Sequence, residues 1–324
     1  MTMAADHGRR VGLLGLGIMG SAMAHHLMAA GFEVLGFDVD PGRLATLVAA
    51  GGVAAASPRE VAAAADIVIS VLPSVKALDE VVLGECGLLA AGRDGLILVE
   101  ASTLPLEDKL RIRDGAAPMI TVLDCPLSGT GAQALSKDLL VYASGDKAAI
   151  ARCAPVFLGF ARAHHDLGEF GNGSKMKFVA NLLVSIHNVA AAEALVLGMK
   201  AGLDPEDIYR VVGDGAGGSR MFSVRGPLMV AERYEPATMK VEVWQKDMAI
   251  ISRFATDLHC PTPLLDACAS VYTAAMAQGR GAHDTACVCA VLGEAARLER
   301  GAVRGNKPEH DQARIGDAGP APSH

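Results

Sequence analysis

Aromatic side chains are scarce in this sequence. They make up 4% of its 324 residues, with a single tryptophan, although 51% of the residues are hydrophobic. The apolar content is therefore mostly small and aliphatic, which lets helices and strands pack closely and is typical of a helix-rich α/β enzyme. At this length we expect two domains, each with a substantial core.

Blocks of like charge and long apolar runs are also missing. The formal net charge is -7 and no five or six like charges stand together, so a nucleic-acid partner has little support. The apolar stretches are interrupted well short of the roughly 18–20 residues that span a membrane. Residues 1–9 lack the apolar segment of a secretory signal. These features predict a cytoplasmic protein with no membrane partner.

The seven cysteines form no recognisable framework. Their number is odd, no Cys-x-x-Cys pair occurs, and no Cys/His spacing is typical of zinc. Cys287 and Cys289 stand in an apolar run, where reduced thiols packed in a core are the expected state. The sequence therefore predicts free thiols and no metal site.

Residues 10–168 alternate short apolar strands with helical stretches. Such alternation indicates a mostly parallel sheet with helices on both faces, a Rossmann-like doubly wound α/β domain. One helix over 21–30 ends at Gly31, and Asp40-Pro41 starts another, since Asp caps a helix and Pro suits its first position. The expected strands are 11–15, 33–37, 67–71, 96–99, 120–123 and 139–143.

From Gly171 the pattern becomes helical. Residues 174–201 are apolar around most of a helix circumference, so we expect one long helix buried between two domains. Asp204-Pro205-Glu206-Asp207 starts a further helix, and periodic segments continue to about Arg297 without a convincing strand. We predict a flexible tail at 1–9, a Rossmann domain at 10–168, an all-helical domain at 169–298 and a disordered tail at 299–324.

A glycine-rich loop follows the first strand. It reads Gly15-Leu16-Gly17-Ile18-Met19-Gly20, the Gly-x-Gly-x-x-Gly spacing of a dinucleotide site, and a helix follows it. Gly15 allows the tight turn, Gly17 lets the backbone approach a pyrophosphate, and Gly20 lets helix and strand pack closely. The helix start adds N–H donors and the positive end of its dipole. We therefore predict that all six residues bind a nicotinamide dinucleotide.

Asp38 ends the second strand, eighteen positions after Gly20. Its carboxylate is placed to accept hydrogen bonds from the adenosine ribose hydroxyls and would repel a 2′-phosphate, which favours NAD over NADP. Asp40 could take this role instead, but it is better explained as the helix cap before Pro41.

Two later strands should end beside the reacting part of the cofactor, because ligands of such sheets bind at the carboxyl ends of the strands. Leu72 and Pro73 follow one of these strands, and Thr103 follows the next. We expect Leu72 and Pro73 to wall the cofactor and Thr103 to hydrogen-bond near the nicotinamide. Pro and Thr also simply end strands, so this alternative stays open.

Lys177 is the candidate catalytic residue. It follows the turn Gly171-Asn172-Gly173, opens the long apolar helix, and has Asn181 one turn further on. A lysine amine can take the hydroxyl proton of an alcohol while hydride leaves for a nicotinamide, and can return it in the reverse reaction. This requires a lowered pKa, which burial or cationic neighbours such as Lys175 and Lys246 would provide.

Polar residues continue the helix face that carries Lys177. Asn181 lies four residues on and can hold the same hydroxyl or a substrate carboxylate. Ser185 and Asn188 follow on this face, where contacts with the second domain explain them better than a ligand does. Arg220 and Arg225 are expected to be structural, or at most distal substrate contacts.

A second glycine-rich turn reads Ser128-Gly129-Thr130-Gly131. Successive backbone N–H groups in such a turn form a concavity for an anion, and Ser128 adds a hydroxyl. The substrate carboxylate is the expected anion, and a plain strand-to-helix turn is the alternative.

Four segments occur in order along the chain: Gly15–Gly20, Asp124–Ala132, Gly171–Asn181 and Lys246-Asp247. Together they resemble the β-hydroxyacid dehydrogenases, which include 3-hydroxyisobutyrate, tartronate-semialdehyde and L-threonate dehydrogenases. The resemblance covers residues 10–297. It implies a Rossmann domain, a helical second domain, an active site in the cleft between them, and a homodimer or homotetramer.

The resemblance also implies roles for single residues. Lys177 matches the catalytic lysine, and Asn181 matches a substrate asparagine. Lys246 matches a lysine near both cofactor and substrate, and Thr103 a cofactor contact. Ser128 and Gly129 match residues of the family loop that binds the substrate carboxylate.

Two positions depart from the family pattern. Thr130 stands where the family loop has a second glycine, so it either narrows the pocket or adds a hydroxyl to it. Ala180 replaces the first of two adjacent asparagines, while Asn181 keeps the second. A common substrate of the family therefore cannot be assumed.

The sequence predicts an NAD-dependent 3-hydroxyacid dehydrogenase for a small, unphosphorylated hydroxy carboxylate. A decarboxylating 6-phosphogluconate-type enzyme is an alternative, but the chain is shorter than such enzymes tend to be and shows no arginine cluster for a phosphate. An imine reductase-like enzyme is disfavoured by Lys177, which such enzymes replace. A non-catalytic NAD-binding module predicts loss of Lys177 or Asn181, and both are present.

Overall fold

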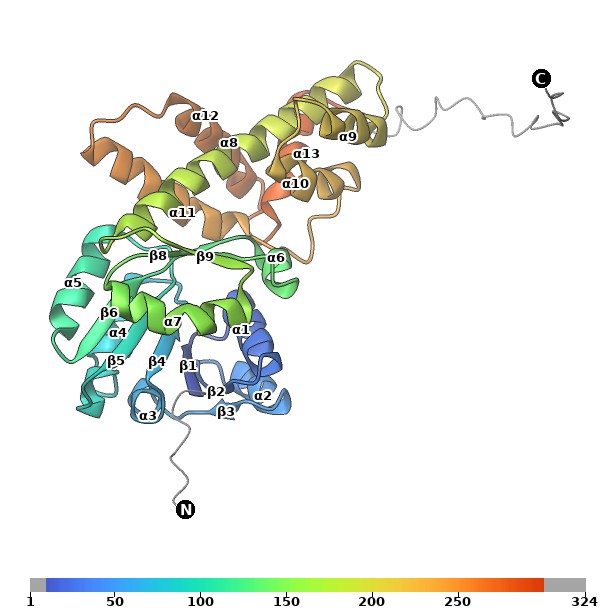
Figure 1. The fold of residues 1–324 in the computed structure, drawn as a ribbon. Helices are drawn as coiled ribbons and strands as arrows, with labels where there is room; N and C mark the ends of the chain where they lie inside the picture. Colours follow the sequence, from blue (N-terminus) through green and yellow to red (C-terminus); the bar gives the residue numbers. More distant parts are fainter. Residues whose placement is uncertain (1–9, 300–324) are drawn as a thin grey trace, which may run out of the picture.

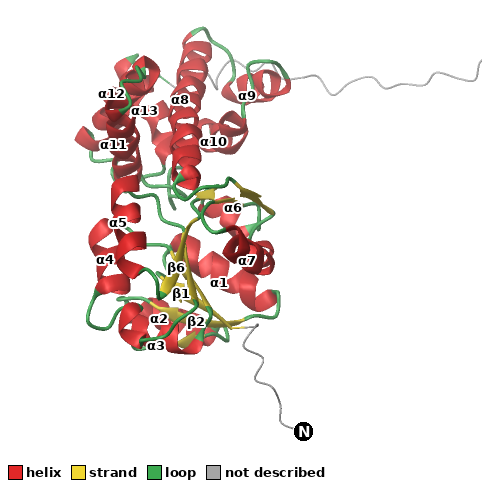
Figure 2. Cartoon of the chain, turned by 60° about the vertical axis from the view of Figure 1, so that its left-hand side comes forward, coloured by secondary structure: helices red, strands yellow, loops and turns green. Residues whose placement is uncertain are grey.

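The computed structural model describes residues 10–299 and has two parts (Figure 1). An α/β part carries the N-terminal half of the chain, and a bundle of helices carries the rest. Figure 2 shows the strands gathered below and the helical bundle above. The tails expected at 1–9 and 299–324 lie outside the described residues, apart from Glu299.

The main sheet has six parallel strands in the order β3-β2-β1-β4-β5-β6. This confirms the predicted doubly wound fold, because the chain moves outward from β1 in one direction and then in the other. The short strand β3 was not predicted. The strands are β1 (Arg10–Leu14), β2 (Glu33–Phe37), β3 (Val53–Ala54), β4 (Ile67–Ser70), β5 (Leu96–Glu100) and β6 (Ile120–Asp124).

Alternate residues of these strands enter two separate cores, since successive side chains of a strand point to opposite faces. Leu13, Ile69 and Val99 pack with the helices α1 (Ile18–Ala29) and α7 (Lys147–Phe160) on one face. Leu14 and Val68 join the core of the other face. The helices of that face are α3 (Pro58–Ala64), α4 (Val75–Leu83) and α5 (Leu106–Ala116).

The strand predicted at 139–143 does not belong to the main sheet, so this part of the prediction was wrong. It forms β8 (Leu140–Ala143), which pairs antiparallel with β7 (Leu127–Ser128) and parallel with β9 (Ala163–Asp166). Hydrogen bonds between Asp124 and Ser144 are the link to β6. Apolar periodicity identifies a strand but not its partners, which explains the error.

The remaining chain is helical, as predicted. The bundle is built around α8 (Asn172–Lys200), which contacts each of the other long helices. The buried Arg225 guanidinium pairs with Asp284, whose carboxylate also accepts hydrogen bonds from Thr238 and from the Met239 and Ala286 N–H groups. The other helices are α9 (Pro205–Asp214), α10 (Arg220–Val230), α11 (Val241–Asp257), α12 (Pro263–Ala277) and α13 (Val288–Ala295).

Helix α8 is less enclosed than the sequence suggested. Met176, Val179 and Leu183 stand three and four residues apart and are 42%, 57% and 46% exposed, so one apolar face is open. The opposite face is buried and carries the polar residues. By length and composition alone α8 could cross a membrane, although no apolar stretch of that length was predicted from the sequence. Here it is the central helix of the bundle, and Figure 1 shows it running from the α/β part to the far end.

Candidate active site

The glycine-rich loop has the backbone that its residue types require. Gly15 has φ +92°, and a Cβ there would lie 2.2 Å from the Val71 carbonyl oxygen; at Gly20 a Cβ would lie 1.9 Å from the Gly15 oxygen. At Gly17 the atom nearest to an added Cβ would be Arg43 Nη1, 3.9 Å away, so the backbone is open to an approaching group. Gly17 precedes α1 without a side-chain cap. An open helix start of this kind fits a pyrophosphate.

Asp38 holds this loop. Its carboxylate accepts hydrogen bonds from the Leu16 N–H (2.7 Å) and the Asp40 N–H (2.9 Å), and Arg43 lies 3.3 Å away. Burial tends to raise the pKa of Asp38, but these donors outweigh it and lower the pKa below its usual value. The charged carboxylate stands at the end of β2, the position expected for a ribose contact.

Residues after β4 and β5 lie against the loop and against the bundle. The Leu72 side chain is near Gly15, and its N–H donates to Ser102. Pro73 is exposed and precedes the cap of α4. The Thr103 carbonyl accepts a hydrogen bond of 2.8 Å from Lys246 Nζ on α11. Thr103 is therefore one of the points at which the α/β part and the helical bundle are in contact.

Lys177 lies in the second turn of α8 and is 9% exposed. Burial lowers its pKa, the Asp247 carboxylate acts in the opposite direction, and the Lys246 ammonium lowers it further; together they bring the pKa of Lys177 to about 8. A buried amine that exchanges its proton near neutral pH is suited to acid–base catalysis. Lys175, the other cation considered from the sequence, is exposed and bonds to Asn172.

Asp247 completes this cluster, although it was not among the site residues predicted from the sequence. Its carboxylate is 5% exposed, accepts a hydrogen bond from Asn181 Nδ2 at 3.1 Å, and pairs with Lys246 at 3.3 Å. Burial raises the pKa of Asp247, while the neighbouring lysines and Asn181 oppose that shift. Its place one position after Lys246 in a recognised motif was the available signal.

The same contact orients Asn181. A carboxylate only accepts hydrogen bonds, so the Asn181 NH₂ group must face Asp247. The Asn181 carbonyl oxygen is thereby left as the acceptor of this amide. From the sequence, Asn181 could hold either a hydroxyl group or a carboxylate of the substrate. An acceptor beside the Lys177 amine suits a hydroxyl group better, so the first role is favoured.

The second glycine-rich turn lies between the cofactor loop and the bundle. Ser128 ends β7, which packs against α8, and Gly129 has φ +138°. A Cβ on Gly131 would lie 2.7 Å from Ile18 and 3.2 Å from the Thr238 oxygen, so the turn touches both parts. The Thr130 N–H is engaged with Gln133 Oε1 at 3.1 Å, which removes one of the expected anion-binding donors.

A buried ionic cluster fixes the start of α8. Lys109 is 1% exposed, and its ammonium lies 2.6 Å from Glu100 and 2.8 Å from Asp124. These carboxylates raise the pKa of Lys109 against the opposing effect of burial. Asp124 also accepts hydrogen bonds from the Ser174 N–H (2.7 Å) and hydroxyl (2.8 Å) in the first turn of α8. The helix that carries Lys177 is thus attached to β6.

The other polar residues weighed from the sequence bond to protein groups outside this cluster or to the α8 backbone. Ser185 donates to the backbone carbonyl of Asn181, and Asn188 donates to the Tyr272 hydroxyl and to the backbone carbonyl of Thr285. Arg220 pairs with Asp138 at 2.6 Å, and Arg225 pairs with Asp284.

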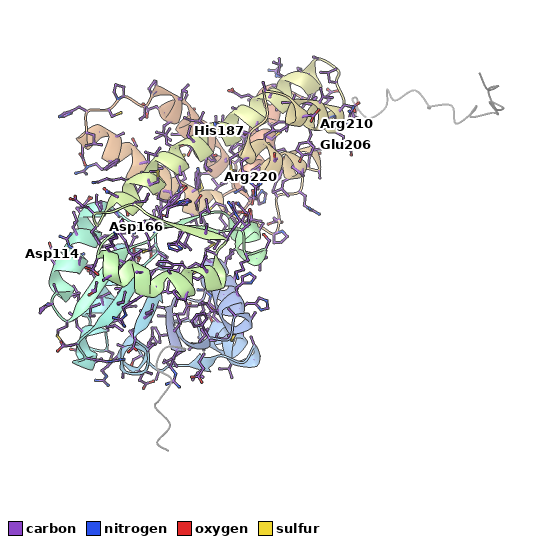
Figure 3. All side chains as sticks on the ribbon, in the orientation of Figure 1. Asp114, Asp166, His187, Glu206, Arg210 and Arg220 are labelled. Carbon is purple, nitrogen blue, oxygen red and sulfur yellow. The ribbon has the colours of Figure 1, made fainter. Side chains whose placement is uncertain are left out.

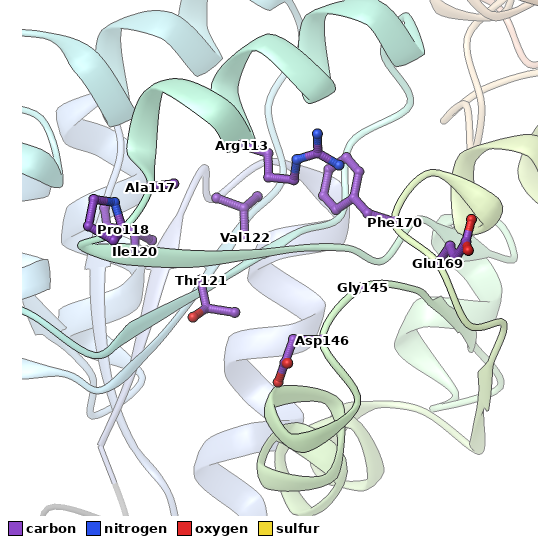
Figure 4. Close-up of a pocket in the computed structure, with 10 residues that line it drawn as sticks. All are labelled: Arg113, Ala117, Pro118, Ile120, Thr121, Val122, Gly145, Asp146, Glu169 and Phe170. Carbon is purple, nitrogen blue, oxygen red and sulfur yellow. The ribbon is translucent and has the colours of Figure 1, made fainter.

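A cavity of about 550 Å³ opens elsewhere, at the free edge of β6 (Figure 4). It is lined by Arg113, Asp146, Glu169 and Phe170 among others, and it contains none of the predicted site residues. The candidate active site is therefore defined by the contacts among Lys177, Asn181, Lys246 and Asp247.

Comparison with known proteins identifies the family of the chain. A family model described as the NAD binding domain of 6-phosphogluconate dehydrogenase matches residues 10–169. A second, described as the NAD-binding of NADP-dependent 3-hydroxyisobutyrate dehydrogenase, matches residues 171–292. The chain belongs to the β-hydroxyacid dehydrogenase family. As a β-hydroxyacid dehydrogenase it is an NAD(P)-dependent enzyme.

Relatives cover nearly the whole chain. L-threonate dehydrogenase of Cupriavidus necator is 33% identical over 88% of this β-hydroxyacid dehydrogenase and 96% of its own length. Glyoxylate/succinic semialdehyde reductase 2 of Arabidopsis thaliana is 31% identical over 87% of this chain and 79% of its own length. The crystal structure of 3-hydroxyisobutyrate dehydrogenase from Salmonella typhimurium superposes with a TM-score of 0.79, at 31% identity over 87% of this chain and 99% of that one.

Proposed function

We propose that this enzyme transfers hydride between a small 3-hydroxy carboxylate and NAD, with Lys177 as the general acid and base. The observation that carries the proposal is the buried Lys177 amine, whose pKa is lowered to about 8 where the two parts of the chain meet. An amine of this pKa can accept a proton from an alcohol and return it to a carbonyl at neutral pH.

Each step of the proton transfer has a residue in this site. NAD, when held by the glycine-rich loop, would supply the acceptor for the hydride that leaves the alcohol carbon. Lys177 accepts the hydroxyl proton, and the Asn181 carbonyl oxygen accepts a hydrogen bond that orients the same hydroxyl. The adjacent Lys246 ammonium disfavours a second positive charge at Lys177 and so keeps its amine neutral for a larger fraction of the time.

The Ser128-Gly129-Thr130 turn is proposed to hold the substrate carboxylate. Because the Thr130 N–H is engaged with Gln133, the remaining donors are the Ser128 hydroxyl and the other N–H groups of the turn. The Thr130 hydroxyl is buried in the capping box at the start of α6, where it faces the Gln133 N–H as an acceptor, and its own proton has no acceptor among the described residues. It can therefore contact a further polar group of the substrate, which supports a hydroxylated substrate over a plain aliphatic one.

A substrate panel tests this proposal. We expect NADH formation, followed by fluorescence, with C3–C5 hydroxy acids, and faster turnover of L-threonate than of 3-hydroxyisobutyrate. L-threonate leads the panel because relatives that act on it, by name, are 31–33% identical to this chain. No turnover of any hydroxy acid with NAD or NADP would contradict the proposed function.

Replacing Asp247 by Asn tests the role of the unpredicted carboxylate. Loss of one charge-assisted hydrogen bond is expected to lower kcat/KM by about 10–100-fold. Asp247 raises the pKa of Lys177, so its removal should also move the rising limb of the oxidation pH profile to lower pH. Asp257→Asn, an exposed change on the same helix, is the control. An unmoved limb would mean that Asp247 does not act on Lys177.

The exposed apolar face of α8 supports a homodimer or homotetramer. Met176, Val179 and Leu183 on this helix form a patch that a second copy of the chain could cover. Sedimentation velocity would decide this, and a monomer at micromolar concentration would rule the assembly out.

A cytoplasmic location is proposed because the seven cysteines are free thiols, and cell fractionation would test it.

A further inference from the structure

Asp138 is a junction of three side chains outside the catalytic cluster. It follows the short helix α6 (Gly131–Leu135), and its Oδ2 accepts from Arg220 at 2.6 Å and from Gln133 Nε2 at 3.2 Å. Its Oδ1 accepts from Arg162 Nε at 2.9 Å. The bond from Gln133, with the two arginines, lowers the pKa of Asp138, so this junction is ionised at neutral pH.

Gln133 connects Asp138 to the second glycine-rich turn. Its NH₂ group is directed to the Asp138 carboxylate, so its carbonyl oxygen faces the Thr130 N–H and accepts from it at 3.1 Å. The Asp138 N–H also donates to the backbone carbonyl of Gln133. Thr130 is 8% exposed. Its N–H is fixed by a series of hydrogen bonds that runs through Gln133 and ends at the Asp138 carboxylate.

Arg220 connects this series of hydrogen bonds to the helical bundle. It is the first residue of α10, which packs against α8, the helix of Lys177. Figure 3 shows Arg220 on the lower part of the bundle, above the α/β part. A continuous path thus runs from α10 through Asp138 and Gln133 to Thr130, and it crosses between the two parts of the molecule.

We propose that Asp138 is a positioning residue for the substrate turn, and that its ion pair with Arg220 makes the position of Thr130 depend on the placement of the helical bundle. This inference rests on the proposed role of the turn in holding the substrate carboxylate. It assigns Asp138 no contact with substrate. Its effect should therefore appear in the KM for the hydroxy acid and not in the KM for NAD.

The experiment compares Asp138→Asn and Arg220→Gln with wild type. We expect Asp138→Asn to raise amide hydrogen exchange of segment 128–135 and to raise the hydroxy-acid KM by about 5–20-fold, with kcat changed less than about twofold. Arg220→Gln removes one exposed ion pair, so a KM rise of about 2–5-fold is expected. Arg220→Lys should restore most of it.

Ionic strength provides a readout that a merely structural role would not move. Salt screens the exposed Arg220–Asp138 pair, so the wild-type KM should rise between 50 and 500 mM NaCl more steeply than that of Arg220→Gln. Arg210→Gln is the matched control, because Arg210 is as exposed (72% against 71%) but pairs with Asp207 within α9. Its KM and salt dependence should equal those of wild type.

The outcomes separate this inference from the proposed function. Unchanged exchange in Asp138→Asn would overturn the inference, and so would faster exchange with an unchanged KM. Exchange is measured on the protein without substrate, so it decides the positioning role even when wild type oxidises no hydroxy acid. That last result would contradict the proposed function alone.

Discussion

Lys177→Met is expected to lower kcat for hydroxy-acid oxidation by about 10²–10⁴-fold, the usual contribution of a general base. Methionine has a similar length and no charge, so the buried site should accept it without unfolding. NAD binding, measured by fluorescence titration, should change little, because Lys177 stands outside the glycine-rich loop. Lys175→Met, an exposed change two residues away, should leave kcat near the wild-type value.

The pH profile gives the same prediction a second test. Oxidation requires the neutral amine, and the pKa of Lys177 is about 8. kcat/KM for oxidation should therefore rise as the pH increases through 8 and level off above it, while reduction, which needs the protonated amine, should fall over the same range. Turnover by Lys177→Met at the wild-type rate would exclude this residue from the mechanism.

Asp38→Asn is expected to lower kcat/KM with NAD by about 10–100-fold, because a charged acceptor for the ribose hydroxyls is replaced by a neutral amide. The same change removes one of the two carboxylates that pair with Arg43, Asp38 at 3.3 Å, and leaves Asp40 at 3.5 Å. The Arg43 guanidinium is then less neutralised and can pair with a 2′-phosphate. The ratio of kcat/KM for NADP to that for NAD should therefore rise. Initial rates with each cofactor measure it.

Asp40→Asn serves as the control for this experiment. Asp40 is the cap of α2 (Pro41–Ala49), where its carboxylate accepts from the Gly42 N–H, and asparagine caps a helix equally well. Asp40 also pairs with Arg43 at 3.5 Å, but in this variant Asp38 keeps its own pair with Arg43 and its ribose position, so cofactor preference should change little. A shift in Asp40→Asn but not in Asp38→Asn would transfer the ribose role to Asp40, the alternative that the sequence left open.

The sequence predicted the α/β fold and most residues of the candidate cluster, because those features depend on local patterns. Alternating strands and helices, the glycine spacing and the Lys177–Asn181 interval each lie within a short stretch of chain. The partners of β8 depend on long-range pairing that no local pattern specifies. Asp247 was passed over for a similar reason, since its role comes from Asn181, 66 positions away.

The Thr130 amide illustrates a second limit. A glycine-rich turn predicts free N–H donors, but whether a given donor is free depends on which side chain reaches it. Here Gln133 takes it, and Asp138 fixes Gln133 in turn. Charged residues at 138 and 220 appear in the sequence as ordinary surface positions. Only their approach across the two parts of the chain makes them relevant to the turn.

The attachment of Ser174 to Asp124 limits how the enzyme can open and close. A swivel centred on the glycines at 171 and 173 would break both hydrogen bonds from Ser174 and expose the ions beneath them. The first turn of α8 is therefore held to the nucleotide-binding half. A movement of the bundle against that half that keeps these bonds has to bend α8 after its first turn.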